Sequence, residues 1–218
     1  MENELDKKQA ETKPAKSSRK WVIGAVLVFV LIISVFAFQK IFPDGLFQSY
    51  YTYNNFEFRK ISGLWTTEVF DTEKKVTYQL PLHYGPKELE YIPVGKSVAL
   101  FPEFAHQFSG PKKIGATYVT YDPDINDSQI SLAYYELSRH METALHIETL
   151  PAITHDVEKI VNETIRECGN STDPVIYLSY KNSTLVDFRG NCLIIQGEGI
   201  ELVKAADRAL YQFYGIMK

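Results

Sequence analysis

The chain has 218 residues, with 23 Lys and Arg against 27 Asp and Glu, which gives a formal net charge of −4 at pH 7. Residues 1–43 carry seven basic and four acidic side chains, whereas residues 44–218 carry 16 and 23. Nucleic-acid phosphates need a basic protein face, so this acidic region predicts no nucleic-acid partner. Its length is sufficient for one sizeable hydrophobic core.

Residues 1–20 contain six basic and four acidic side chains and almost nothing apolar. Such a segment cannot bury enough apolar surface to order itself. We expect a disordered basic tail, and the excess of positive charge predicts that this tail is cytoplasmic.

Residues 21–38 are an uncharged run of 18 residues, of which thirteen are Leu, Ile, Val or Phe. A helix of that length rises about 27 Å, close to the thickness of a bilayer's hydrocarbon core. We expect a transmembrane helix over residues 21–42, in contact with the lipid bilayer, with the C-terminal domain outside the cell membrane. The alternative is a cleaved signal peptide with Val35 and Ala37 before the cut, but the run is longer than a usual signal-peptide core.

Two further features suit an extracytoplasmic location. Cys168 and Cys192 are an even pair, which in an oxidising compartment predicts a disulfide; two buried thiols or a Cys/His nucleophile site are the alternatives. Four asparagines stand in Asn-x-Ser/Thr motifs and are possible N-glycosylation sites: Asn126, Asn162, Asn170 and Asn182.

The first half of residues 44–218 is predicted to form strands. Residues 43–54 form a juxtamembrane aromatic segment, and the extracytoplasmic domain proper is expected over residues 55–218. Alternation of apolar and polar residues predicts strands at 55–61, 64–70 and 76–82, the last two joined by a hairpin turn. Further short strands are expected at 97–101 and 116–121, which together suggest an antiparallel meander.

The second half of this region shows both helical spacing and strand alternation of its apolar residues. Apolar residues at three-and-four spacing predict helices over 128–145 and over 154–168, the latter with Thr154 as N-cap and Gly169 as its stop. Strands are expected at 175–180, 184–188 and 191–196, followed by a helix over 198–214. The predicted class is therefore α+β, with a mainly antiparallel sheet and about three helices.

Three stretches carry a resemblance: PVIYLSY at residues 174–180, GNCLIIQGEGIELVKAADRALYQFYGIM at 190–217 and YNNFEFRKISGLW at 53–65. They resemble uncharacterised short single-pass membrane proteins of small-genome archaea. The resemblance covers about a third of the outer domain and includes Cys192. It implies an archaeal surface protein with a disulfide, and it carries no activity, ligand or catalytic residue.

The acidic stretch Asp122-Pro-Asp124-Ile-Asn126-Asp127 places oxygen ligands at positions 1, 3 and 5 of a calcium loop. However, Asp127 replaces the glycine of position 6, and Ala133 stands where a bidentate glutamate is needed. We interpret the stretch as an Asx turn leading into the helix near residue 128, and predict no metal site.

Gly197-Glu-Gly199 follows a strand and opens a helix, as in a dinucleotide-binding loop. The third glycine is replaced by Leu202, and the chain ends before an acidic ribose ligand. We interpret it as a strand-to-helix turn and predict no cofactor. The five histidines show no metal-ligand spacing, and no catalytic residue is predicted: His83, His106, His140, His146 and His155.

These observations predict a membrane-anchored extracytoplasmic protein of the cell envelope that works by binding a protein or surface-layer partner. The alternative is an anchored extracytoplasmic hydrolase whose site is assembled from residues distant in sequence. That alternative requires a deep pocket lined by a histidine and a carboxylate.

Overall fold

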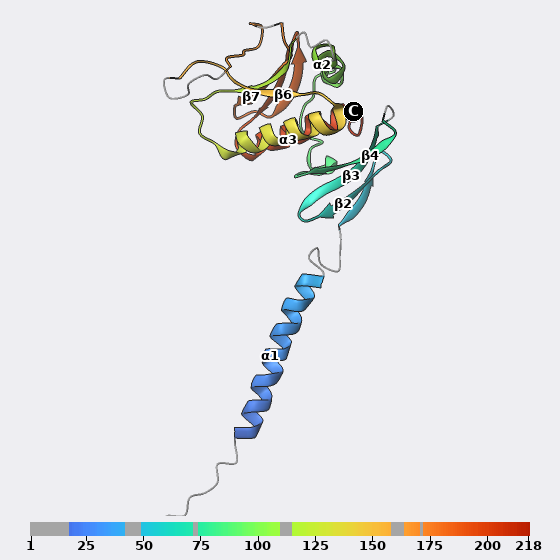
Figure 1. The fold of residues 1–218 in the computed structure, drawn as a ribbon, viewed down its shortest axis with the longest axis vertical. Helices are drawn as coiled ribbons and strands as arrows, with labels where there is room; N and C mark the ends of the chain where they lie inside the picture. The colour runs from blue at the N-terminus through green and yellow to red at the C-terminus, as the bar shows by residue number, and fades with distance from the viewer. Residues whose placement is uncertain (1–17, 42–48, 72–73, 110–114, 158–163, 171) are drawn as a thin grey trace, which may run out of the picture. The chain divides into compact units, whose positions relative to one another are not determined.

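The computed structural model describes residues 18–41, 49–71, 74–109, 115–157, 164–170 and 172–218. The chain divides into two units, Met1–Leu46 and Phe47–Lys218, which are considered separately. Figure 1 draws the chain as a ribbon coloured by residue number, with labels on some of the helices and strands.

The first unit contains one helix, α1 (Ser18–Ile41), which confirms helical structure for most of the predicted span. Side chains are described for residues 23–34 of this helix, and its large apolar side chains are exposed, from 48% for Ile32 to 65% for Phe29. Among the described residues, no helix combines the length and the hydropathy of a membrane span. The transmembrane assignment of residues 21–42 therefore stays a prediction.

The second unit begins with an antiparallel meander of four strands: β1 (Tyr50–Tyr53), β2 (Phe56–Ile61), β3 (Leu64–Asp71) and β4 (Val76–Leu82). The three predicted strands are confirmed, and β1 adds an edge strand within the segment expected to be juxtamembrane. Phe58, Leu80 and Leu82 are fully or almost fully buried, whereas their neighbours along the strands are half-buried or exposed. The alternating pattern arises because one face of the meander packs on the core and the other faces solvent.

The other sheet is mixed, with strand order β6-β5-β7-β9-β8. Its bounds are β5 (Thr117–Tyr121), β6 (Thr149–Ile153), β7 (Val175–Tyr180), β8 (Leu185–Arg189) and β9 (Cys192–Gly197). The first four strands in this order are parallel, and β8 runs antiparallel to β9. The α+β class is confirmed, but residues 117–121 join a parallel sheet instead of extending the meander.

The described residues of this unit form three α-helices: α2 (Phe101–Ser109), α3 (Ser128–Leu145) and α4 (Ile200–Phe213). The predicted helices 128–145 and 198–214 are confirmed. The predicted strand 97–101 is wrong, because the 3-10 turns η1 (Pro86–Glu88) and η2 (Val98–Leu100) lead instead into α2.

The predicted helix over 154–168 is also wrong where the structure describes it; residues 158–163 lie outside the described residues. The backbone N–H of Ile153 donates to Thr164 O at 3.0 Å, and the N–H of Arg166 donates to Ile153 O at 3.0 Å. These bonds hold residues 164–166 as extended chain beside β6, so Thr154 caps no helix. The strand β6 itself was missed because Pro151 interrupts its pattern, yet an edge strand tolerates proline.

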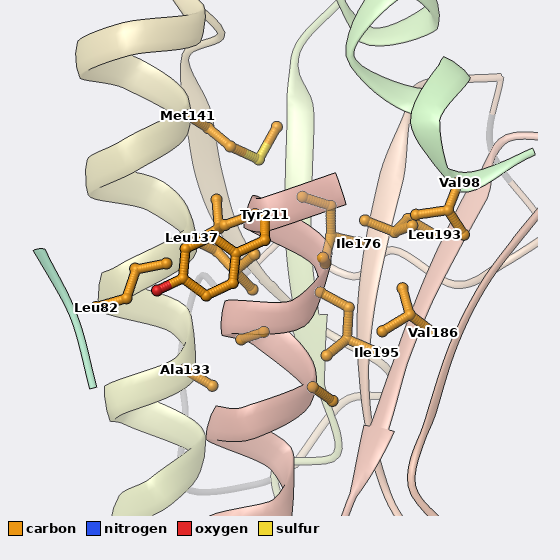
Figure 2. Close-up of a cluster of buried hydrophobic side chains, with 14 of the residues drawn as sticks. Leu82, Val98, Ala133, Leu137, Met141, Ile176, Val186, Leu193, Ile195 and Tyr211 are labelled. Atoms are coloured by element: carbon orange, nitrogen blue, oxygen red, sulfur yellow. The ribbon is translucent and has the colours of Figure 1, made fainter. Parts of the chain in front are cut away.

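Both sheets and all three helices of the unit share one hydrophobic core. Helices α3 and α4 pack on each other and contact the mixed sheet, while Tyr211 of α4 meets Phe58 of the meander with ring centroids 5.7 Å apart. Figure 2 shows Leu137 of α3, Tyr211 of α4 and Ile176 of β7 within one continuous cluster. This core fixes the position of the strand ends on which the candidate site is built.

Candidate functional site

The carboxyl edge of the parallel strands is where loop side chains gather in this fold. Strand β5 lies between β6 and β7, and its crossover through α3 leads to β6 on one side, while β7 pairs on the other. The strand order therefore reverses between β5 and β7. Open parallel sheets bind ligands in the crevice outside the carboxyl ends of their strands at such a reversal.

A cavity of about 400 Å³ opens at this edge, between the end of β5, the first turns of α3 and β6. Its wall combines aromatic and aliphatic side chains with a few polar groups, which is the usual composition of a small-ligand site. The residues that decide its chemistry are Tyr121, Ile130, Tyr134, Asn126, Asp127 and Ser131.

Asp127 holds the rim of this cavity in place. Its Oδ1 accepts a hydrogen bond from the backbone N–H of Gln129 at 2.8 Å, as the N-cap of α3, and its Oδ2 accepts from the Tyr180 hydroxyl at 2.7 Å. These two bonds, the backbone one first, lower the pKa of Asp127. The hydrogen bond between Asp127 and Tyr180 raises the pKa of the Tyr180 hydroxyl. The pair thus ties the loop after β5 to the end of β7.

The loop before this cap forms the predicted Asx turn, since Asp122 Oδ1 accepts from the backbone N–H of Asp124 at 3.0 Å. The structure adds His155, from the end of β6, whose Nε2 lies 3.1 Å from Asp124 Oδ2. Ligand atoms of Asp122, Asp124 and His155 all lie within 4.8 Å of one another.

In the described part of the chain this is the one group of three side chains placed to hold a metal ion. Two carboxylates and an imidazole suit Zn²⁺ or a similar transition metal better than Ca²⁺, which prefers six to eight oxygen ligands. Asp127, the remaining acid of the stretch, is committed to the helix cap. Asp124 and His155 also contact each other directly at an exposed position, where their side chains are 73% and 44% exposed.

The two glycines after β9 have structural causes. A Cβ on Gly197 would lie 2.5 Å from the backbone of Glu201 and of Leu202, so glycine lets the first turn of α4 close over the strand end. Gly199 adopts φ +56°, a conformation that favours glycine. The interpretation of this motif as a strand-to-helix turn is confirmed.

The disulfide between Cys168 and Cys192 is present, with Cα atoms 5.3 Å apart. Cys192 is the first residue of β9, so the bond lies at the amino end of the parallel strands, away from the cavity. Of the glycosylation motifs, Asn126, Asn170 and Asn182 are exposed, and Asn162 lies outside the described residues. A glycan on Asn126 would stand at the cavity itself.

Four histidines pair with groups that the sequence could not reveal, because the partners lie 31 to 75 positions away. His83 contacts Glu136, His140 donates to Pro81 O at 3.1 Å, and His146 contacts Asp71 at 2.8 Å. His106 is exposed on α2. No local spacing signals these pairs.

Comparison with protein-family models, with curated proteins and with solved structures finds no match. The resemblance to archaeal single-pass proteins stays a prediction, and the function must be argued from the geometry of this chain.

Proposed function

We propose that this chain is a membrane-anchored protein of the cell envelope that binds its partner at the carboxyl edge of the mixed sheet. The observation that carries the proposal is the cavity of about 400 Å³ beside the strand-order reversal, on the β6 side of β5. It is walled by Tyr121, Tyr134 and Ile130 and edged by polar groups. An aromatic and aliphatic wall with few polar groups binds by burial and orients its ligand by hydrogen bonds.

The anchor is proposed on independent grounds. Helix α1 exposes Ile23, Val28 and Phe29, which point to three different sides of the helix. A helix that is apolar all round needs a protein core or a membrane around it. The basic tail before it predicts a cytoplasmic N-terminus. The disulfide suits an oxidising compartment outside.

Orientation can be tested in cells with a thiol reagent that does not cross membranes. We expect Ser183→Cys, in the exposed turn after β7, to react in intact cells, and Ser17→Cys to react only after lysis. The native cysteines do not interfere because they are bonded to each other. Equal reaction of both variants in intact cells would contradict the proposed topology.

The partner can be tested by photo-crosslinking in native membranes. A photoreactive amino acid replaces Ser131, which is exposed at the cavity, and in a matched control it replaces Gln107, which is exposed on α2. We expect a discrete adduct from position 131 that is absent from position 107. Identical adduct patterns, or none from 131, would contradict binding at this edge.

A second function is favoured by one observation, the convergence of Asp122, Asp124 and His155 from the ends of two strands. A metal held there would lie beside the cavity and would assist hydrolysis, as expected for an anchored hydrolase with a site assembled from distant residues. Against it, the described lining of the cavity contains Asp127 but no histidine. Turnover of ester, phosphoester or peptide substrates that needs Zn²⁺ and is lost in Asp124→Asn would favour the hydrolase over the binding protein.

A further inference from the structure

Three ionisable side chains meet where the meander joins the helices. His83 follows β4, Glu136 lies in the middle of α3 and Asp207 lies in α4. Asp207 is fully buried and Glu136 is 4% exposed. Neither the cavity nor the anchor uses these groups.

Glu136 and Asp207 each have one carboxyl oxygen with a partner and one without. Glu136 Oε1 contacts His83 Nδ1, and Asp207 Oδ2 accepts from the backbone N–H of Tyr84 at 2.9 Å. The other two oxygens, Glu136 Oε2 and Asp207 Oδ1, are buried without an N–H or O–H partner. Because His83 and Tyr84 are consecutive residues and α3 packs on α4, these contacts place the two carboxyl groups side by side.

Two carboxylates cannot hydrogen-bond unless one of them carries a proton, and two buried anions side by side repel strongly. We propose that Asp207 keeps its proton at neutral pH and donates it to Glu136, so that one shared proton closes the joint between the meander and helices α3 and α4. When Asp207 loses that proton, the hydrogen bond to Glu136 is lost and the meander is held less strongly on α3 and α4.

The electrostatics agree with this geometry. Burial raises the pKa of Asp207 well above its usual range, the hydrogen bond and the charge of Glu136 raise it further, and the backbone N–H groups of Tyr84 and His83 oppose the rise. On the meander side, the His83 side chain contacts Glu136 and is 38% exposed.

The other titratable groups around the joint do not supply a neutralising charge. Lys204 of α4 is bound to Glu201 at 2.7 Å, and the pKa of His140 on α3 is lowered by burial, which keeps it neutral. The remaining groups that act on the pair or its neighbours are neutral hydroxyls or a further acid: Tyr51 of β1, Tyr84, Tyr211 of α4 and Glu88 of η1.

The pH dependence follows with a definite sign. The folded chain binds one proton more than the unfolded chain between the ordinary pKa of an aspartate and the raised pKa of Asp207. In that window the folding equilibrium constant should fall by up to tenfold for each unit of rising pH. The contribution is complete below the window and lost above it.

The direct test is infrared spectroscopy of the full chain in detergent micelles at pH 7. We expect a protonated-carboxyl band in the native chain that disappears in Asp207→Asn, whose amide keeps both hydrogen bonds without a titrating proton. Glu136→Gln serves as the second variant, because its amide donates to Asp207 and removes the need for the proton. Glu57→Gln, at an exposed site of the meander, should leave the band unchanged.

Urea unfolding across the same pH range provides the second readout. The native chain should lose stability as pH rises, whereas Asp207→Asn should show a flatter profile. Absence of the band at pH 7 in a native chain that is fully folded would overturn the proposal, as would a pH profile unchanged by both variants.

Discussion

The two sheets of the folded unit are held in different ways. The mixed sheet is buried on both faces along its central strands, so Val175, Ile176, Leu178, Leu193 and Ile195 are all nearly inaccessible. The meander buries one face only. It is attached through a few groups, notably the buried side chains of Phe58 and Leu82 and the hydrogen bond from the Tyr84 N–H to Asp207. The mixed sheet is thus the frame that carries the cavity, and the meander is a cover whose attachment depends on a small junction.

The largest expected effect comes from truncating that junction. Phe58→Ala should lower the free energy of unfolding by about 3 to 5 kcal/mol, because a fully buried ring leaves a cavity against Tyr211. Phe70→Ala, in the same meander but 62% exposed, should change it by less than about 0.5 kcal/mol. Urea unfolding measures both.

Hydrogen exchange sharpens the same comparison. If the meander is a cover on a separate frame, Phe58→Ala should raise exchange in β1–β4 while the central strands of the mixed sheet stay protected. Uniform loss of protection in both sheets would show that they unfold as one unit and would break the distinction.

The next effect concerns the frame. Replacing both Cys168 and Cys192 by serine should cost about 3 to 4 kcal/mol on the chain-entropy estimate for a loop of this length. The loss should appear first in the segment around residue 168 and in β9, since the bond joins these two. Reductant should destabilise the native chain similarly and leave the double variant unaffected, which serves as the control.

A smaller effect is expected at the rim of the cavity. Asp127→Ala removes the cap of α3 and the partner of Tyr180, at a cost of about 1 to 2 kcal/mol. Asp127→Asn retains a capping oxygen and should cost less. Thermal unfolding measures both variants, and an equal loss in the two would mean that charge, not the cap, matters here.

The smallest effect is a pH dependence at the junction. Burial, followed by the charge of Arg139, lowers the pKa of His140 below its ordinary value near 6.5. The unfolded chain therefore takes up this proton first as pH falls, so the contribution of His140 to stability, opposite in sign to that of Asp207, should decline from about pH 6.5 downward through the folded value. His140→Gln should reduce that decline, measured by urea unfolding at pH 7.5 and pH 5; an unchanged decline would assign it to other groups.

The sequence anticipated the meander well because its pattern has a local cause. In β4, residues Leu80 and Leu82 face the core and alternate with more exposed neighbours, which is a period that can be counted along the chain. The sequence predicts helix α3 equally well, from its buried apolar stripe and its N-cap Asp127. Strands β7 and β9 were found, but not that they run parallel, since direction depends on the crossovers between them.

The failures have a physical reason as well. Residues around 160 repeat at helical spacing, yet hydrogen bonds between Ile153 and residues 164 and 166 place the described part of that segment beside β6. A short apolar run fits a helix or a strand, and its neighbours decide between them. Local spacing does not reveal the contact of His155, because its partner Asp124 lies 31 positions away at the end of another strand.

The sequence by itself determined the local periods, the apolar helix near the N-terminus, the helix cap at Asp127 and the glycine turn after β9, because each depends on residues a few positions apart. The tertiary structure alone decided which strand ends share an edge, which placed His155 beside Asp124 and the Tyr180 hydroxyl on Asp127. It also brought Glu136 against Asp207, 71 positions away. Such contacts depend on how α3 and α4 pack between two sheets, and no spacing along the chain encodes that packing.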